Sequence, residues 1–121
     1  MPSILSIFQA VRDNNLAAVT QIISTSPHLV HDRQSGNNWT PLHQGAFRGY
    51  GEVCSLLLRH GAEVDAVGPV YGTPLMLAVD GNHGEVCNIL LSHGANVNYM
   101  NTIGGFTPLH SAVQYGYLDI C

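Results

Sequence analysis

The segment Thr40-Pro41-Leu42-His43 is the main indicator of the fold, because it recurs along the chain. It recurs as Thr73-Pro74-Leu75-Met76 and as Thr107-Pro108-Leu109-His110, at spacings of 33 and 34 residues. Each copy predicts a helix start, since the threonine side chain can accept a backbone N–H at the N-cap and proline suits the first helical position. A helix start that repeats at this period indicates a stack of similar supersecondary units.

Four units with boundaries near 3–39, 40–72, 73–106 and 107–121 account for one domain over the whole chain. The second and third units each predict two helices, the first beginning at the threonine and the second near Glu52 or Glu85. Gly61 and Gly94 predict the left-handed caps of the second helices. The first unit is a weaker version with a break at Asn14-Asn15, and the fourth stops inside its second helix.

The break after the first helix falls on only two residue types. Asn14, Gly49, Asn82 and Gly116 occupy this position in the four units. Glycine and asparagine best tolerate left-handed backbone angles, so the position predicts a positive φ. A backbone requirement explains the column without any function.

The composition excludes several classes of function. Only 10% of the 121 residues are charged, lysine is absent, and four arginines oppose eight acidic residues to give a net charge of -4. This balance argues against nucleic acid and against an anionic membrane surface as partners, because both need clustered cations. No segment has the features of a signal peptide or of a membrane span, so we expect a cytoplasmic protein, with the nucleus as the alternative.

The chain resembles the ankyrin-repeat family, and the resemblance is carried by segments of the second and third units. Those segments are Thr40-Pro41-Leu42-His43, Glu52-Val53, Leu56-Leu57-Leu58, Gly61-Ala62-Glu63-Val64-Asp65, Thr73-Pro74-Leu75 and Gly94-Ala95-Asn96-Val97-Asn98. The resemblance implies an all-α solenoid of stacked antiparallel helix pairs with β-hairpin-like loops, with about three complete repeats and a truncated fourth. It also implies binding of another protein through the concave helix face and the hairpin tips, without catalysis. Met76 and Gly45 depart from the usual His and Ala.

The cysteines and histidines predict structure rather than chemistry. Cys54, Cys87 and Cys121 fall in one column with Val19, which indicates a small buried position and reduced thiols. Five of the seven histidines occupy repeat positions, and His28 and His31 lie in a loop beside Asp32. A zinc site needs three or four converging ligands, whereas a solenoid spreads equivalent residues along its axis. We therefore predict no metal and no cofactor.

The predicted partner-binding residues sit beside the repeated motif. In the family the variable positions lie just before each Thr-Pro and in the last turn of the first helix. Here those positions and the third connection hold Trp39, Phe47, Arg48, Tyr71, Asp80, Tyr99, Ile103, Phe106, Gln114 and Tyr115. Aromatic residues and arginine are enriched at interface cores. For Trp39 and Phe106, packing against a neighbouring hairpin is an equal alternative, whereas Phe47, Arg48, Tyr71 and Tyr115 are expected to be exposed.

Three functions compete. A protein-interaction module comes first, and the client-recruiting part of a larger adaptor, such as a ubiquitin-ligase substrate receptor or scaffold, is the alternative. An enzyme comes last, because no catalytic constellation remains once the repeat is explained. The stop at Cys121 motivates a further expectation: either the natural chain continues, or the uncapped C-terminal end supports self-association.

Overall fold

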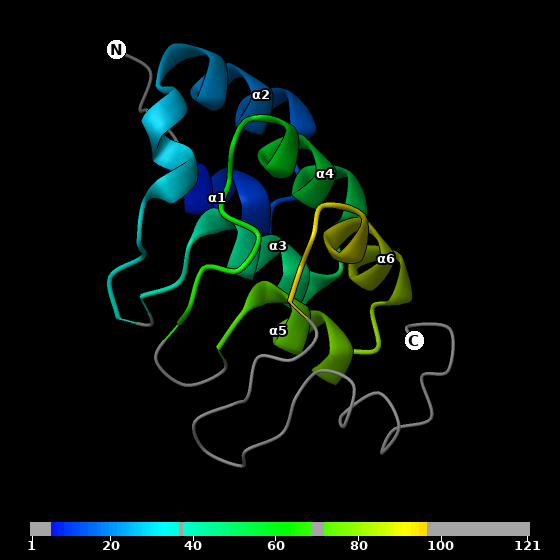
Figure 1. Ribbon diagram of the computed structural model, residues 1–121. Coiled ribbons are helices and arrows are strands. Elements are labelled where there is room, and N and C mark those ends of the chain that lie inside the picture. The colour runs from blue at the N-terminus through cyan, green and yellow to red at the C-terminus, as the bar shows by residue number, and fades with distance from the viewer. Residues whose placement is uncertain (1–5, 37, 69–71, 97–121) are drawn as a thin grey trace.

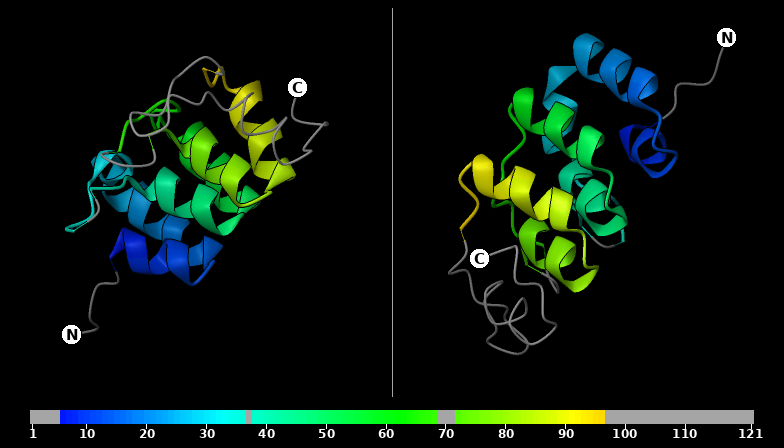
Figure 2. Two further views of the ribbon diagram at one scale, coloured as in Figure 1. Left: turned by 90° about the horizontal axis from the view of Figure 1, so that it is seen from below. Right: turned by 90° about the vertical axis from the view of Figure 1, so that its right-hand side faces the viewer.

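Six α-helices in two layers make up the part of the chain that the computed structural model describes, which is residues 6–36, 38–68 and 72–96. They are α1 (Ile7–Arg12), α2 (Leu16–Thr25), α3 (Pro41–Arg48), α4 (Gly51–Arg59), α5 (Pro74–Asp80) and α6 (Gly84–Ser92). Helices α1, α3 and α5 pack side by side in an inner layer, and α2, α4 and α6 form an outer layer (Figure 1). The right-hand view of Figure 2 separates the two rows. The predicted all-α stack of helix pairs is confirmed.

Threonine caps start the inner helices as the sequence predicts. The hydroxyl oxygen of Thr40 accepts the backbone N–H of His43 at 3.3 Å, and that of Thr73 accepts the N–H of Met76 at 3.4 Å. Proline follows each threonine at the first helical position. In the first unit Ser6 caps α1 instead, through a 3.0 Å bond from the N–H of Gln9. The repeated tetrapeptide is therefore a structural start signal.

The predicted left-handed column is confirmed at the three described positions. Asn14, Gly49 and Asn82 have φ angles of 52°, 77° and 59°. The caps after the outer helices also have positive φ, with 93° at Gly61 and 88° at Gly94. Gly116 lies outside the described residues.

One hydrophobic core runs through all the described units. Leu42, Leu57, Leu75 and Leu90 come from four successive helices, and each is 0% exposed. They belong to a single cluster that also includes Val11 of the first unit. Because neighbouring units supply both sides of this core, no unit buries its apolar face alone.

The connections between units are tied to one another by hydrogen bonds. One guanidinium nitrogen of Arg33 donates to the carbonyl oxygens of Asn38 at 3.0 Å and Val67 at 2.8 Å. The β-hairpin-like loops predicted from the resemblance are represented, within residues 38–68 and 72–96, by one isolated antiparallel bridge between Gly68 and Gly72. In this bridge the Gly68 N–H donates to the Gly72 carbonyl oxygen at 2.7 Å. The connection before α3 and the described part of the connection after α4 lie on the same side of the helix layers (Figure 1).

The segment after α2 differs from the sequence prediction. We expected a loop around His28 and His31, but Pro27–His31 forms a 3-10 helix, η1. Proline at its first position fixes the backbone angle that the short helix needs, and Val30 is buried beneath it. The first unit thus covers its side of the core with an extra element that the other described units lack.

Candidate functional site

Trp39 and His43 form a buried pair at the start of α3. The two rings stack with centroids 6.3 Å apart, and Trp39 is 8% exposed. A side chain at Gly68 would lie 3.3 Å from Trp39, so the next connection covers the indole closely. Of the two alternatives that the sequence left open for Trp39, these surroundings favour packing against the hairpin.

His43 holds the helix start to the following connection. Its Nδ1 accepts the Thr40 N–H at 3.1 Å, and its Nε2 lies 2.9 Å from the Gly72 oxygen, to which it donates. These partners define the neutral imidazole with the proton on Nε2. Burial lowers the pKa of His43 to about 4, and the positive charge of Arg33 contributes in the same direction.

Phe47 is an exposed aromatic residue on a helix that is otherwise largely buried. Its ring is tilted against Trp39 with centroids 5.3 Å apart, yet the residue is 49% exposed. Its carbonyl oxygen lies 3.0 Å from Nε2 of His83 in the next unit, which donates to it. The predicted exposure of Phe47 is confirmed, and its ring rests on a buried support.

Arg48 is exposed and held by a short chain of glutamines. Nε2 of Gln44 donates to Oε1 of Gln34 at 3.0 Å, and Nε of Arg48 donates to Oε1 of Gln44 at 3.3 Å. Gln44 is 5% exposed and Gln34 comes from the first connection. The sequence pointed to Arg48 but missed both glutamines, because neither stands at a family position.

Asp80 and Val67 are two further exposed residues. Asp80 ends α5 at the position that corresponds to Phe47 one unit earlier, and it is exposed. Partial burial raises its pKa. Val67, on the connection before α5, is 46% exposed. No pattern in the sequence singled out Val67, since a single valine in a connection belongs to no column.

Six of the predicted contact residues lie outside the residues that the structure describes. They are Tyr71, Tyr99, Ile103, Phe106, Gln114 and Tyr115. Their role in binding stays a prediction. Among the described candidates, Trp39, Phe47 and Arg48 come together at α3 and Asp80 lies at the end of the neighbouring α5.

Among the residues that the structure describes, no three His, Cys, Asp or Glu side chains gather as metal ligands. His60 and His93 stand at the C-terminal caps of α4 and α6. His28 and His31 lie exposed on η1. His43 and His83 bond backbone carbonyls, as described above, so His43, His60, His83 and His93 each have a place in the repeat. His28 and His31 belong instead to η1, which the other described units lack.

The cysteine column is buried where it is described. Cys54, Cys87 and their first-unit equivalent Val19 are each 0% exposed, and neither cysteine forms a disulfide. Burial raises the pKa of Cys54 to about 12, with the nearby Glu85 carboxylate acting in the same sense. Both thiols are therefore poor nucleophiles in the folded chain.

Thiol modification should report this burial. In the variant Cys121→Ser, Cys54 and Cys87 should react with a thiol reagent at pH 8 at least about 100-fold more slowly in buffer than in concentrated urea, because reaction requires opening of the core. The measurement is absorbance of the released chromophore over time. A native reaction as fast as that of the unfolded chain would contradict the burial of these cysteines.

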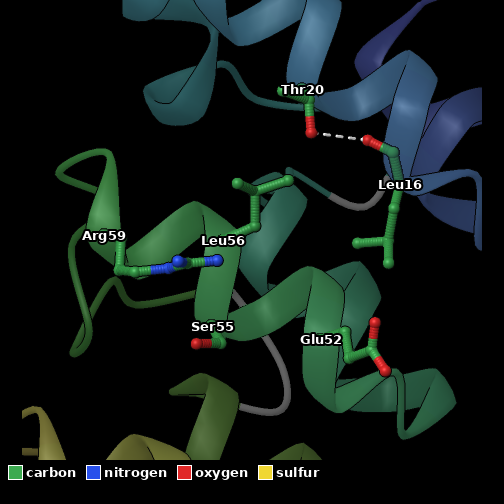
Figure 3. Close-up of a pocket in the computed structure, with 6 residues that line it drawn as sticks. All are labelled: Leu16, Thr20, Glu52, Ser55, Leu56 and Arg59. Atoms are coloured by element: carbon green, nitrogen blue, oxygen red, sulfur yellow. Dashed lines mark hydrogen bonds between the residues drawn. The ribbon is translucent and has the colours of Figure 1, made fainter.

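An open hollow of about 250 Å³ lies between α2 and α4 in the outer layer (Figure 3). Its lining mixes aliphatic, hydroxyl and charged side chains from the two helices: Leu16, Thr20, Glu52, Ser55, Leu56 and Arg59. The Thr20 hydroxyl is engaged by the Leu16 carbonyl oxygen at 2.7 Å. Between α4 and α6, the Glu85 carboxylate lies so close to Gly51 that a side chain at Gly51 would overlap it.

No helix in the described ranges is both long and apolar enough to cross a bilayer.

Two curated relatives share part of their length with this chain. It is 32% identical over 111 residues to "Probable E3 ubiquitin-protein ligase XBOS32" of Oryza sativa subsp. japonica, which is 92% of this chain and 22% of that protein. It is 39% identical over 62 residues to "Serine/threonine-protein kinase VIK" of Arabidopsis thaliana, which is 51% of this chain and 14% of that protein. The chain thus spans less than a quarter of either relative.

A family model described as "Ankyrin repeats (3 copies)" matches residues 7–101 and 70–121. The two matches together cover nearly the whole chain, and the stacked helix pairs with left-handed breaks agree with them. Ankyrin repeats indicate a protein-interaction module. On the combined evidence of sequence, fold and family model, the chain belongs to the ankyrin-repeat family.

Proposed function

We propose that the chain binds a partner protein through the inner layer and the connections that project beside it. The observation that carries this proposal is Phe47, which is 49% exposed although most of α3 is buried. An aromatic ring with a rigid support loses little conformational entropy on binding, which is typical of residues that dominate interface energies.

Other features support the same surface. Val67, the second large apolar residue exposed among the described residues, lies on the connection before α5. Arg48 follows Phe47 in the chain, and Asp80 stands at the equivalent of Phe47 on the neighbouring helix α5, so the inner helices carry charges of both signs. Arginine is enriched at interfaces.

Affinity capture with matched variants tests the proposal. A partner captured by the folded chain and identified by mass spectrometry should be lost with Phe47→Ala and weakened with Val67→Ala. The variant Arg59→Ala on the outer layer should retain it. We expect Phe47→Ala to weaken binding by about 2 kcal/mol, measured by calorimetry with the purified partner.

The control is the free energy of unfolding in urea, which should change little for Val67→Ala and Arg59→Ala. Phe47→Ala should lose about 1 kcal/mol with its contact to Trp39 and remain folded. A partner that is retained by Phe47→Ala and Val67→Ala but lost with Arg59→Ala would place the contact on the outer helices and overturn the proposal.

The second candidate function is client recruitment within a larger adaptor protein. It is favoured by the relative described as a ubiquitin-protein ligase, which aligns with 92% of this chain. In this view the repeats hold the client and a further domain acts on it. Sequencing the natural transcript beyond codon 121 tests this, and a stop codon there would exclude an appended effector domain.

The two buried reduced thiols support a cytoplasmic or nuclear setting for either function.

A further inference from the structure

Two rows of residues lead from the preceding connection onto helix α3 and end in exposed groups of different chemistry. One row runs through Trp39 and His43 to Phe47 and ends in an exposed aromatic ring. The other runs through Gln34 and Gln44 to Arg48 and ends in a guanidinium group. In each row, the exposed residue lies one helical turn beyond a buried residue, so both groups are held by the core.

The guanidinium group has its outer end available. Its Nε is engaged by Gln44, and Arg48 makes no other hydrogen bond or ion pair within the described part of the chain. The two terminal nitrogens of an arginine so held match the two oxygens of a carboxylate. Because Gln44 is 5% exposed and bonded in turn to Gln34, the direction of the side chain is partly fixed before any partner arrives.

The Asp80 carboxylate limits the kind of ligand that Arg48 could bind. Asp80 ends the adjacent helix α5 at the position equivalent to Phe47 and is exposed. Packed helices lie about 8–10 Å apart, so a run of negative charges that reached from Arg48 toward α5 would meet this carboxylate. A single acidic residue on Arg48, with an apolar residue on Phe47, avoids that repulsion.

We propose that α3 recognises an acidic residue of a partner protein next to a large apolar residue. The carboxylate binds the terminal nitrogens of Arg48, and the apolar side chain packs on Phe47. Gln44 acts as a positioning residue for the guanidinium group. This inference rests on the proposed function, and it names the chemistry of the partner segment that the inner layer would accept.

Selection from a random twelve-residue peptide display library tests the specificity. Against the folded wild-type chain, the selected peptides should carry Asp or Glu within two residues of Leu, Met, Phe or Trp. Against Arg48→Glu, the acidic position should change to Lys or Arg while the apolar position persists. Against Arg59→Glu, which makes the same change of charge at the end of α4, the selection should match that of the wild type.

The size of the effect is measured as the affinity of the wild-type chain and of each variant for one peptide that the wild type selected. Arg48→Glu should weaken it at least about tenfold, because attraction is replaced by repulsion. Arg48→Gln should weaken it less and abolish its dependence on salt, and unfolding in urea verifies that each variant is folded.

The outcomes separate the two proposals. If the wild type selects no peptide and captures no partner, the proposed function fails and this inference fails with it. If the wild type selects peptides without an acidic preference, or if Arg48→Glu keeps the wild-type preference, the inference is overturned while the proposed function stands.

Discussion

At pH 4 the folded chain should be about 3 kcal/mol less stable through His43 alone than at pH 7. The folded-state pKa is lowered from 6.5 to about 4, first by burial and then by Arg33. The unfolded chain therefore binds this proton more readily than the folded chain. The stabilising contribution is complete above pH 6.5 and is lost as the pH falls toward 4.

The variant His43→Gln isolates this effect. Glutamine at the third helical position can still reach back to the Thr40 N–H, but it loses the contact with the Gly72 oxygen. We expect the variant to be about 1 kcal/mol less stable than the wild type at pH 7. By pH 4 it should be the more stable of the two, because the wild type alone carries the cost of protonating His43.

Urea unfolding at intervals between pH 7 and pH 4 measures the difference between the two chains. His60→Gln, which removes an exposed histidine at the end of α4, is the matched control and should keep the slope of the wild type. Equal pH slopes for wild type and His43→Gln would show that His43 does not account for the acid sensitivity.

Gly49→Ala should destabilise the chain by about 2–3 kcal/mol. A left-handed backbone costs about 1–2 kcal/mol for a residue with a side chain, and φ is 77° at Gly49. The added methyl group would also lie 2.7 Å from Cε1 of His83, which displaces the imidazole and breaks its bond to the Phe47 oxygen. That bond contributes about 1 kcal/mol more.

Gly61→Ala is the control, because its φ is 93° and a methyl group there meets nothing within 4 Å. It should show the backbone effect alone, about 1–2 kcal/mol, in thermal or urea unfolding. In a chain that also carries His83→Ala, the effect of Gly49→Ala should fall to that of Gly61→Ala. If Gly49→Ala and Gly61→Ala are equally destabilising with His83 present, the imidazole contact has no energetic weight.

Periodic positions were the predictable part of this molecule. The threonine caps, the left-handed breaks at Asn14, Gly49 and Asn82, and the buried cysteine column all follow from a backbone geometry that each unit repeats. A requirement that occurs three or four times leaves a visible column even in a single sequence.

Whether an individual aromatic residue is buried or exposed depended on contacts that do not repeat from unit to unit. The sequence predicted exposure for Phe47 and left Trp39 evenly divided between partner contact and packing against a hairpin. The connection at Gly68 covers Trp39 and leaves Phe47 exposed. Gln34 supports Gln44 from a connection whose length and sequence are peculiar to the first unit. Such contacts bring together residues from different units, and no single column records them.

The bond from His83 to the carbonyl oxygen of Phe47 links the exposed aromatic of one repeat to the turn of the next. Any force or protease that acts first on the third repeat would release this carbonyl before the second repeat itself unravels. Conversely, a protein that clamps Phe47 in its native position would raise the free energy needed to open the third repeat. Binding of a partner at Phe47, as we propose, would therefore be thermodynamically coupled to the stability of the third repeat.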